Sequence, residues 1–131
     1  LWKVPLVFVL TLLVGANLGL AGISLPFFEP MIAASLMVLG LVIAMKWRVM
    51  PLLASMIVAV FALFHGYAHG IEMPLAASPV AYVTGFSLAT ILLHGLGAML
   101  AYGFQQTSQV VLMRAGGVGL VGAGLMLLIG A

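Results

Sequence analysis

Apolar residues form long runs along the chain, separated by short segments that hold most of its prolines and polar residues. A helix that crosses a bilayer needs about 20 predominantly apolar residues. Proline is tolerated in the first turn of a helix, where its missing N–H costs no hydrogen bond. If prolines mark helix starts and polar clusters mark connections, the pattern predicts five spans, at 4–22, 30–46, 51–70, 79–103 and 109–130.

The predicted connections are short, so consecutive spans are expected to run antiparallel. Ser78 and Ser108 precede the fourth and fifth spans and are candidate N-caps, because serine is favoured at that position. We therefore expect an all-α protein in which residues 1–131 form a single transmembrane domain, a polytopic transmembrane helix bundle with about five spans.

Composition supports a membrane protein and excludes several other classes. Hydrophobic residues make up 66% of the chain and charged residues only 5%, whereas soluble domains hold roughly 45–50% apolar and about 25% charged residues. Four Lys/Arg cannot form a basic surface for nucleic acid, so we expect no such partner. The absence of cysteine excludes disulfides, thiolate metal sites and iron–sulfur clusters. We expect the protein to be surrounded by the lipid bilayer.

The few charged residues predict an orientation. Antiparallel spans place all basic residues on one side of the membrane: Lys3, Lys46, Arg48 and Arg114. Glu29 and Glu72 fall on the other side. By the positive-inside rule the basic side faces the cytoplasm. We therefore expect a multi-pass protein with the N-terminus of this chain in the cytoplasm and its C-terminus in the periplasm.

Small residues recur at a spacing of four, which lets helix backbones approach closely in lipid. The sets with this spacing are Gly15/Gly19, Gly66/Gly70, Gly97/Ala101 and Ala115/Gly119/Ala123. We expect these sets to form helix–helix contacts. Asn17, in the middle of the first span, is expected to hydrogen-bond between helices, and the side chain of Arg114 to extend to the cytoplasmic interface.

The candidate chemistry lies at the end of the third span, where His65, His69 and Glu72 are spaced i, i+4 and i+7. At about 100° per residue these side chains share one helical face. Imidazole and carboxylate ligands suit a divalent first-row metal, and ionisable residues inside membrane spans are costly and usually functional. The spacing resembles the H-x-x-x-H of metalloproteases, but Gly66 stands where their catalytic Glu would be. The stripe therefore predicts a metal site without catalysis.

His94, in the middle of the fourth span, is a fourth candidate metal ligand. If spans three and four both begin at a membrane surface, His94 lies roughly 10 Å from His65 along the membrane normal. One compact site with all three histidines is therefore not expected, and separate stations at different depths are. The alternative for His94 is a hydrogen bond between helices.

The segment Phe64–Pro74 resembles the F-H-G-x-A-H-G-x-E-x-P signature of the HupE/UreJ membrane proteins. The resemblance extends along the chain, to Pro26 and Pro30 before span two, to Ala89–His94 in span four and to the glycine-rich last helix. These proteins are bacterial secondary permeases for nickel or cobalt, associated with hydrogenase and urease maturation.

The resemblance implies secondary transport of a divalent transition metal across the bacterial inner membrane. Ni²⁺ is the first expectation and Co²⁺ the next, each as the transported ion and with no resident cofactor. Members of the family usually begin with a signal peptide and a helix that carries H-P-x-x-G-x-D-H, and neither occurs in these 131 residues. We therefore expect a partial protein that holds half of the metal site.

Other functions fit the sequence less well. A helical subunit or scaffold of a larger membrane complex, with a vestigial or structural metal site, is the main alternative. The sequence leaves open association into a homo-oligomer or with other membrane subunits. An enzyme is not expected, because three histidines are too few for a di-iron membrane enzyme. The nearest match to the G-x-S-G of rhomboid proteases, Gly85–Leu88, lacks the second glycine.

Overall fold

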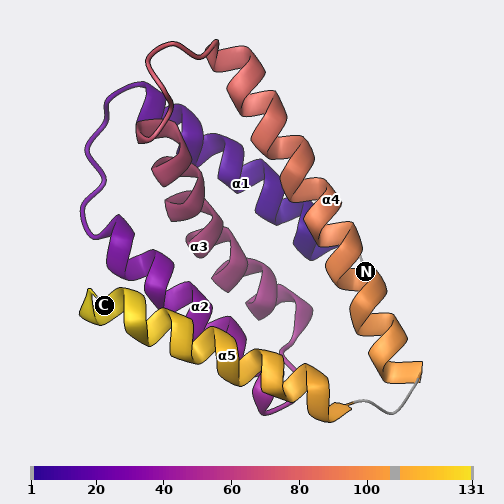
Figure 1. Cartoon of the computed structure of the whole chain (residues 1–131). Helices are drawn as coiled ribbons and strands as arrows, with labels where there is room; N and C mark the ends of the chain where they lie inside the picture. Colours follow the sequence, from indigo (N-terminus) through magenta and orange to yellow (C-terminus); the bar gives the residue numbers. More distant parts are fainter. Residues whose placement is uncertain (1, 107–109, 131) are drawn as a thin grey trace. The chain divides into compact units, whose positions relative to one another are not determined.

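The computed structural model describes residues 2–106 and 110–130, and these residues are all-helical apart from turns and connections (Figure 1). In chain order the helices are α1 (Lys3–Leu20), α2 (Phe28–Ala44), α3 (Pro51–Ile71), α4 (Pro79–Gln106) and α5 (Val110–Ile129). Each helix lies at one of the predicted spans, which confirms the all-α fold. All but α2 are long and apolar enough to cross a membrane, and α2 is an apolar helix of 17 residues.

Helix α1 ends two residues before the predicted end of the first span. Gly22 adopts a left-handed conformation with φ 70°. Its N–H donates to the carbonyl of Gly19 at 3.0 Å, and the N–H of Ile23 donates to the carbonyl of Leu18 at 3.1 Å. This bond pair is a Schellman motif, which satisfies carbonyls that the helix leaves without intrahelical partners.

Helix α2 ends in the same motif, although no glycine marks the position. Lys46 takes the left-handed conformation with φ 54°. Its N–H donates to Ile43 at 3.2 Å, and the N–H of Trp47 donates to Val42 at 3.0 Å. A residue with a Cβ loses about 1–2 kcal/mol in this conformation. The left-handed turn and its two hydrogen bonds nevertheless end the helix at Ala44, and not at the predicted residue 46.

Helix α4 begins at the predicted proline and continues three residues beyond the predicted end, from Pro79 to Gln106. Ser78 precedes it as predicted, and its backbone carbonyl accepts the N–H of Tyr82 at 2.9 Å. Ser108, the other candidate N-cap, lies outside the described residues.

The chain forms two compact units. The first comprises Leu1–Phe28 and Met50–His94, and the second comprises Glu29–Val49 and Gly95–Ala131. The first unit therefore contains α1, α3 and the N-terminal part of α4, and the second contains α2, the rest of α4 and α5.

In the first unit α1 and α3 lie side by side at very short range (Figure 1). A Cβ placed on Gly66 would collide with the backbone carbonyl of Leu12, and one on Gly19 would lie 2.6 Å from the carbonyl oxygen of Tyr67. Gly15 and Gly70 meet backbone atoms of the facing helix in the same way. Both predicted small-residue pairs of these helices are confirmed. Contacts advance along both helices together, so α1 and α3 run parallel.

In the second unit the predicted run Ala115/Gly119/Ala123 is wrong, because a Cβ on Gly119 would meet nothing within 4 Å. The glycines that approach α2 are Gly117, whose Cβ would lie 2.6 Å from the Ala44 nitrogen, and Gly124. Helix α5 carries small residues on more than one face, and spacing alone does not say which face contacts a neighbour. The pair Gly97/Ala101 likewise has no close approach at Gly97.

Arg114 holds α5 against the end of α2. Its Nε donates to the carbonyl oxygen of Ala44 at 2.7 Å, a group at the helix C-terminus that favours a cationic donor. The predicted extension of this side chain to the interface is therefore accompanied by a helix-capping bond. The contacts of α5 run opposite in direction to those of α2, so these helices are antiparallel.

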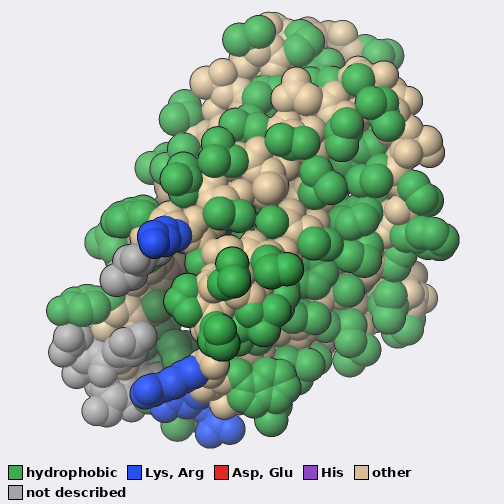
Figure 2. Space-filling view, turned by 180° about the vertical axis from the view of Figure 1, so that it is seen from behind, with side chains coloured by type: hydrophobic (Ala, Val, Ile, Leu, Met, Phe, Trp, Pro, Cys, Tyr) green, Lys and Arg blue, Asp and Glu red, His purple; other side chains and the backbone are tan. Residues whose placement is uncertain are grey.

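The surface is dominated by hydrophobic side chains, with Lys and Arg in a few places on the face shown in Figure 2. Such a surface suits lipid and not water. Asn17 is exposed, and its amide donates to the carbonyl of Leu13 in its own helix at 2.7 Å. Among the described residues Asn17 therefore makes no hydrogen bond to another helix, and the prediction of such a bond is wrong there.

Candidate metal site

His65 and His69 lie in the last two turns of α3, and Glu72 is the cap residue that follows the helix. The backbone N–H of Glu72 donates to the carbonyl of Ala68 at 3.0 Å, so the helical path continues to Glu72 as the predicted spacing requires. Both histidines are partly buried, and Glu72 is exposed.

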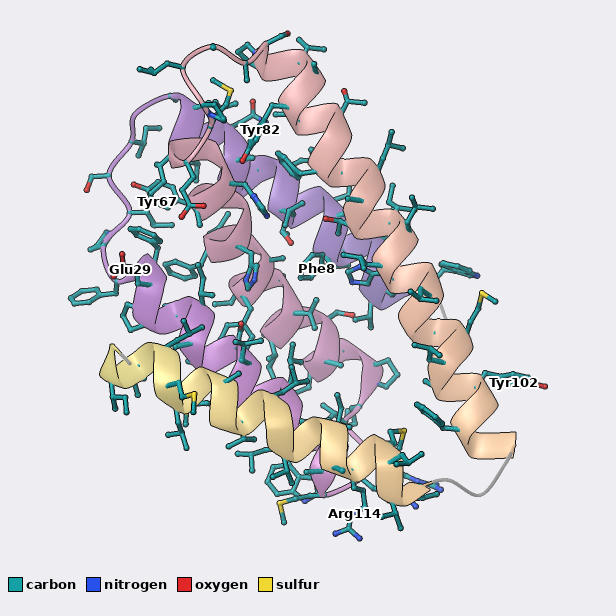
Figure 3. The ribbon with its side chains drawn as sticks, viewed as in Figure 1. Phe8, Glu29, Tyr67, Tyr82, Tyr102 and Arg114 are labelled. Carbon is teal, nitrogen blue, oxygen red and sulfur yellow. The ribbon has the colours of Figure 1, made fainter. Side chains whose placement is uncertain are left out.

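All three histidines line one cavity of about 230 Å³ in the first unit. Helix α1 contributes Phe8 and Leu12 to its wall, and helix α4 contributes Thr90 and Leu93 beside His94. Figure 3 shows Phe8 on α1 facing α4. Glu72 does not line this cavity. The structure thus brings His94 to the two histidines of α3 and leaves Glu72 at the end of the helix.

His94 lies beside the N-terminal half of α1. The His94 ring lies 4.7 Å from the ring of Phe8, centroid to centroid, whereas Gly66 faces Leu12. Phe8 and Leu12 are one turn apart on α1, and both line the cavity that His65 and His94 share. The separation of roughly 10 Å along the membrane normal stays a prediction.

Sharing a cavity does not make the histidines a ready ligand cluster. Across residues 2–106 and 110–130, no group of three or more His, Asp or Glu side chains is arranged to hold one metal ion. This agrees with the expectation that the three histidines do not form one compact site.

The tautomer of His94 follows from its hydrogen bond. Its Nδ1 lies 2.9 Å from the carbonyl oxygen of Thr90. A carbonyl only accepts, so Nδ1 must carry the proton, and in the neutral ring the lone pair is on Nε2. Metal-binding histidines commonly use this arrangement, in which a backbone carbonyl fixes the ring and the other nitrogen binds. The bond lies within α4, so it does not supply the interhelical role considered as the alternative.

The Nδ1 atom of His65 is buried and has no hydrogen-bond partner among the described residues. Buried polar atoms without partners are uncommon and call for an explanation such as a missing ligand. A bound cation would satisfy this nitrogen.

Aromatic residues hold His69 in place, and the sequence interpretation missed them. The His69 ring stacks on Phe86 with centroids 4.9 Å apart and 8° between planes, and Tyr82 meets Phe86 edge-on at 5.6 Å. Tyr82, Phe86, Thr90 and His94 recur every four residues along α4. This spacing could have indicated from the sequence that Tyr82 and Phe86 lie beside His94, because residues i and i+4 lie on one helical face.

The apolar helices are long enough to span a membrane, and those of the first unit pack through glycines and enclose imidazole side chains. These features define a multi-pass membrane protein with a candidate cation site. The chain belongs to the HupE/UreJ family, whose model, "HupE / UreJ protein", matches residues 1–127. This confirms the family predicted from the Phe64–Pro74 segment. HupE/UreJ proteins are associated with nickel and cobalt transport and not with catalysis.

A curated relative, "Protein HupE" of Rhizobium leguminosarum bv. viciae, is 43% identical over 127 residues. The match covers 95% of this chain and 66% of the relative, so the chain spans slightly less than two thirds of the relative's length. No solved structure matches this chain significantly.

Proposed function

We propose that this protein transports a divalent transition-metal ion, Ni²⁺ first and Co²⁺ next, across the bacterial inner membrane. The observation that carries the proposal is the cavity that His65, His69 and His94 line together. Imidazole nitrogens suit both ions, although affinity alone would favour Cu²⁺. Selectivity then depends on geometry and on metal supply. Membership of the HupE/UreJ family supports the same substrate class.

Glu72 would capture the ion at the outer end of α3. The carboxylate follows the C-terminal end of the helix, where the helix dipole disfavours a negative charge. Its position therefore contributes little to the stability of α3 and suits attraction of a cation. One turn inward, His69 would receive the ion, and His65 would hold it at the cavity.

His94 would pass the ion onward, because its side chain lines a second cavity as well. This cavity, of about 190 Å³, lies between α1 and α4 and is also lined by Trp2, Pro5 and Ile91. It extends from His94 toward the beginning of α1, which is the predicted cytoplasmic end. His94 lines both cavities, so it is the residue we expect to pass the ion from one to the other.

Uptake of radioactive ⁶³Ni²⁺ by cells without other nickel importers tests the proposal. The protein should be expressed with whatever residues precede Leu1 in the native chain. Metal-dependent accumulation above the empty-vector level is expected. If a well-expressed protein gives no such accumulation, the alternative is favoured: a subunit that does not itself transport and belongs to a larger complex.

Replacing His94 with Ala is expected to reduce uptake about tenfold or more, the scale on which metal sites respond to loss of a supporting or binding group. Ni²⁺ binding to the purified variant should persist through His65, His69 and Glu72, and equilibrium dialysis measures it. Leu92→Ala is the matched control, because Leu92 is 72% exposed on the same helix. Normal uptake by a well-folded His94→Ala protein would remove His94 from the pathway.

The proposed orientation predicts opposite labelling at the two ends of the spans. Single cysteines at Met50 and Ser78 are introduced into a chain without any cysteine, and both positions are exposed. A membrane-impermeant thiol reagent added to intact spheroplasts should label Ser78→Cys and not Met50→Cys. Labelling of Met50→Cys alone would invert the orientation and place Glu72 on the cytoplasmic side.

A further inference from the structure

The second unit contains an open apolar groove of about 470 Å³. Its walls come from the end of α2, the C-terminal part of α4 and the first half of α5, and every lining residue is apolar or glycine. Ile43, Phe104 and Met113 are among them. Gly116 leaves room in the groove, because a Cβ there would meet nothing within 4 Å.

One end of the groove adjoins the basic residues of this unit. Ile43 precedes Ala44, whose carbonyl accepts the Nε–H of Arg114, and Arg114 lies near the N-terminal end of α5 (Figure 3). That bond uses one of the five N–H donors of the guanidinium. Among the described residues the two terminal NH₂ groups have no acceptor, so they can donate to a ligand. Lys46 and Arg48 follow the same end of α2 and are exposed.

Within the described residues of this unit, no acidic side chain lies near this charge. Glu29 is the acid of this unit, and it lies in the first turn of α2, about 20 Å along the helix from Ala44. The groove therefore joins an apolar channel to a cluster of positive charge at one end. That combination matches a molecule with a hydrocarbon chain and an anionic head.

We propose that this groove binds an anionic phospholipid, with one acyl chain along the apolar walls and the phosphate at Arg114. Guanidinium groups bind phosphate oxygens through paired N–H donors. Basic pockets between membrane helices on the cytoplasmic side bind acidic headgroups, and the proposed orientation places these residues on that side. The lipid would brace α5 against the end of α2 beside the Arg114 cap.

Quenching of Trp47 fluorescence by brominated lipid tests the proposal. Trp2→Phe leaves Trp47, next to Lys46, as the single tryptophan. The full chain is reconstituted into phosphatidylcholine vesicles that contain acyl-brominated phosphatidylglycerol or acyl-brominated phosphatidylcholine. Half-maximal quenching is expected at an about fivefold lower mole fraction of the anionic lipid, the preference that one basic residue gives near a membrane surface. Equal quenching by both lipids would overturn the proposal.

Two pairs of variants separate the groove from a general attraction of anionic lipid. Gly116→Phe fills the groove and keeps every charge, so it should abolish the preference. Gly119→Phe is its control, because Gly119 has the same open space and does not line the groove. Arg114→Gln should also abolish the preference, whereas Lys3→Gln in the first unit should not. A preference that survives Gly116→Phe would overturn the proposal, even where Arg114→Gln fails to fold.

A final arm separates lipid phosphate from free phosphate. Excess inorganic phosphate, at ionic strength matched with chloride, should leave the preference unchanged, because the acyl chain contributes to binding. Loss of the preference with inorganic phosphate would assign the basic cluster to a soluble anion and would overturn the lipid assignment.

Discussion

Single substitutions His65→Ala, His69→Ala and Glu72→Gln are each expected to lower Ni²⁺ uptake to about a tenth or less of the wild-type rate, as loss of a metal-site group does. His65 and His69 line the same cavity, and Glu72 follows one turn later on the same helix. The proposed function has the three side chains serve one ion in succession, so removal of any of them should stop the same passage. Double variants should therefore be little slower than single ones, the non-additivity expected of residues that share a task.

Initial rates of ⁶³Ni²⁺ uptake, corrected for the amount of protein in the membrane, measure this effect. Glu29→Gln is the matched control for Glu72→Gln, because it removes the one other carboxylate side chain of the sequence and lies in the second unit. Wild-type uptake by a well-expressed Glu72→Gln protein would mean that Glu72 does not attract the cation. Losses that multiply in the double variants would assign the residues to independent steps.

The positions of the helices could be predicted from the sequence because the determinants are local. Bilayer thickness sets the length of an apolar run, and proline in the first turn marks a start, as it does at Pro51 and Pro79. The ends were less accurate. A left-handed glycine after α1 is a recognisable stop signal, whereas Lys46 in that conformation is not.

Which face of a helix contacts a neighbour could be predicted only in part. The glycine pairs of α1 and α3 are the main small-residue stripes of those helices, and they meet. Helix α5 has several such stripes, and the contacting face includes Arg114 and Gly117 because Arg114 caps α2. A tertiary bond of this kind is not visible in residue spacing.

The residues of the candidate site could likewise be predicted only where they lie on one helix. The stripe of His65, His69 and Glu72 lies within one helix, so periodicity sufficed to group the residues. The distance from His65 to His94 depends on the register of α4 against α3, which the connection at residues 72–78 leaves free. The ring of Phe86 on His69 depends on that register too.

A single methyl group added at Gly66 is expected to force α1 away from α3. The new Cβ would overlap the carbonyl group of Leu12, whose carbonyl carbon would be only 2.7 Å away. Backbone atoms cannot rotate aside as a side chain can, so one helix must shift. Overpacking of this kind costs about 1–3 kcal/mol and occasionally more. Gly66→Ala should therefore lower the thermal unfolding temperature in detergent.

The shift should also reach the candidate site, because Gly66 adjoins His65 and Leu12 lines the histidine cavity. Gly66→Ala is thus expected to lose Ni²⁺ uptake although every proposed metal ligand is present. Gly85→Ala on α4 is the matched control: a Cβ there meets nothing within 4 Å, and alanine is favoured over glycine inside a helix by about 1 kcal/mol. If Gly66→Ala unfolds at the wild-type temperature, α1 and α3 do not approach closely at Leu12. The histidine cavity would then not be lined by Leu12 as described.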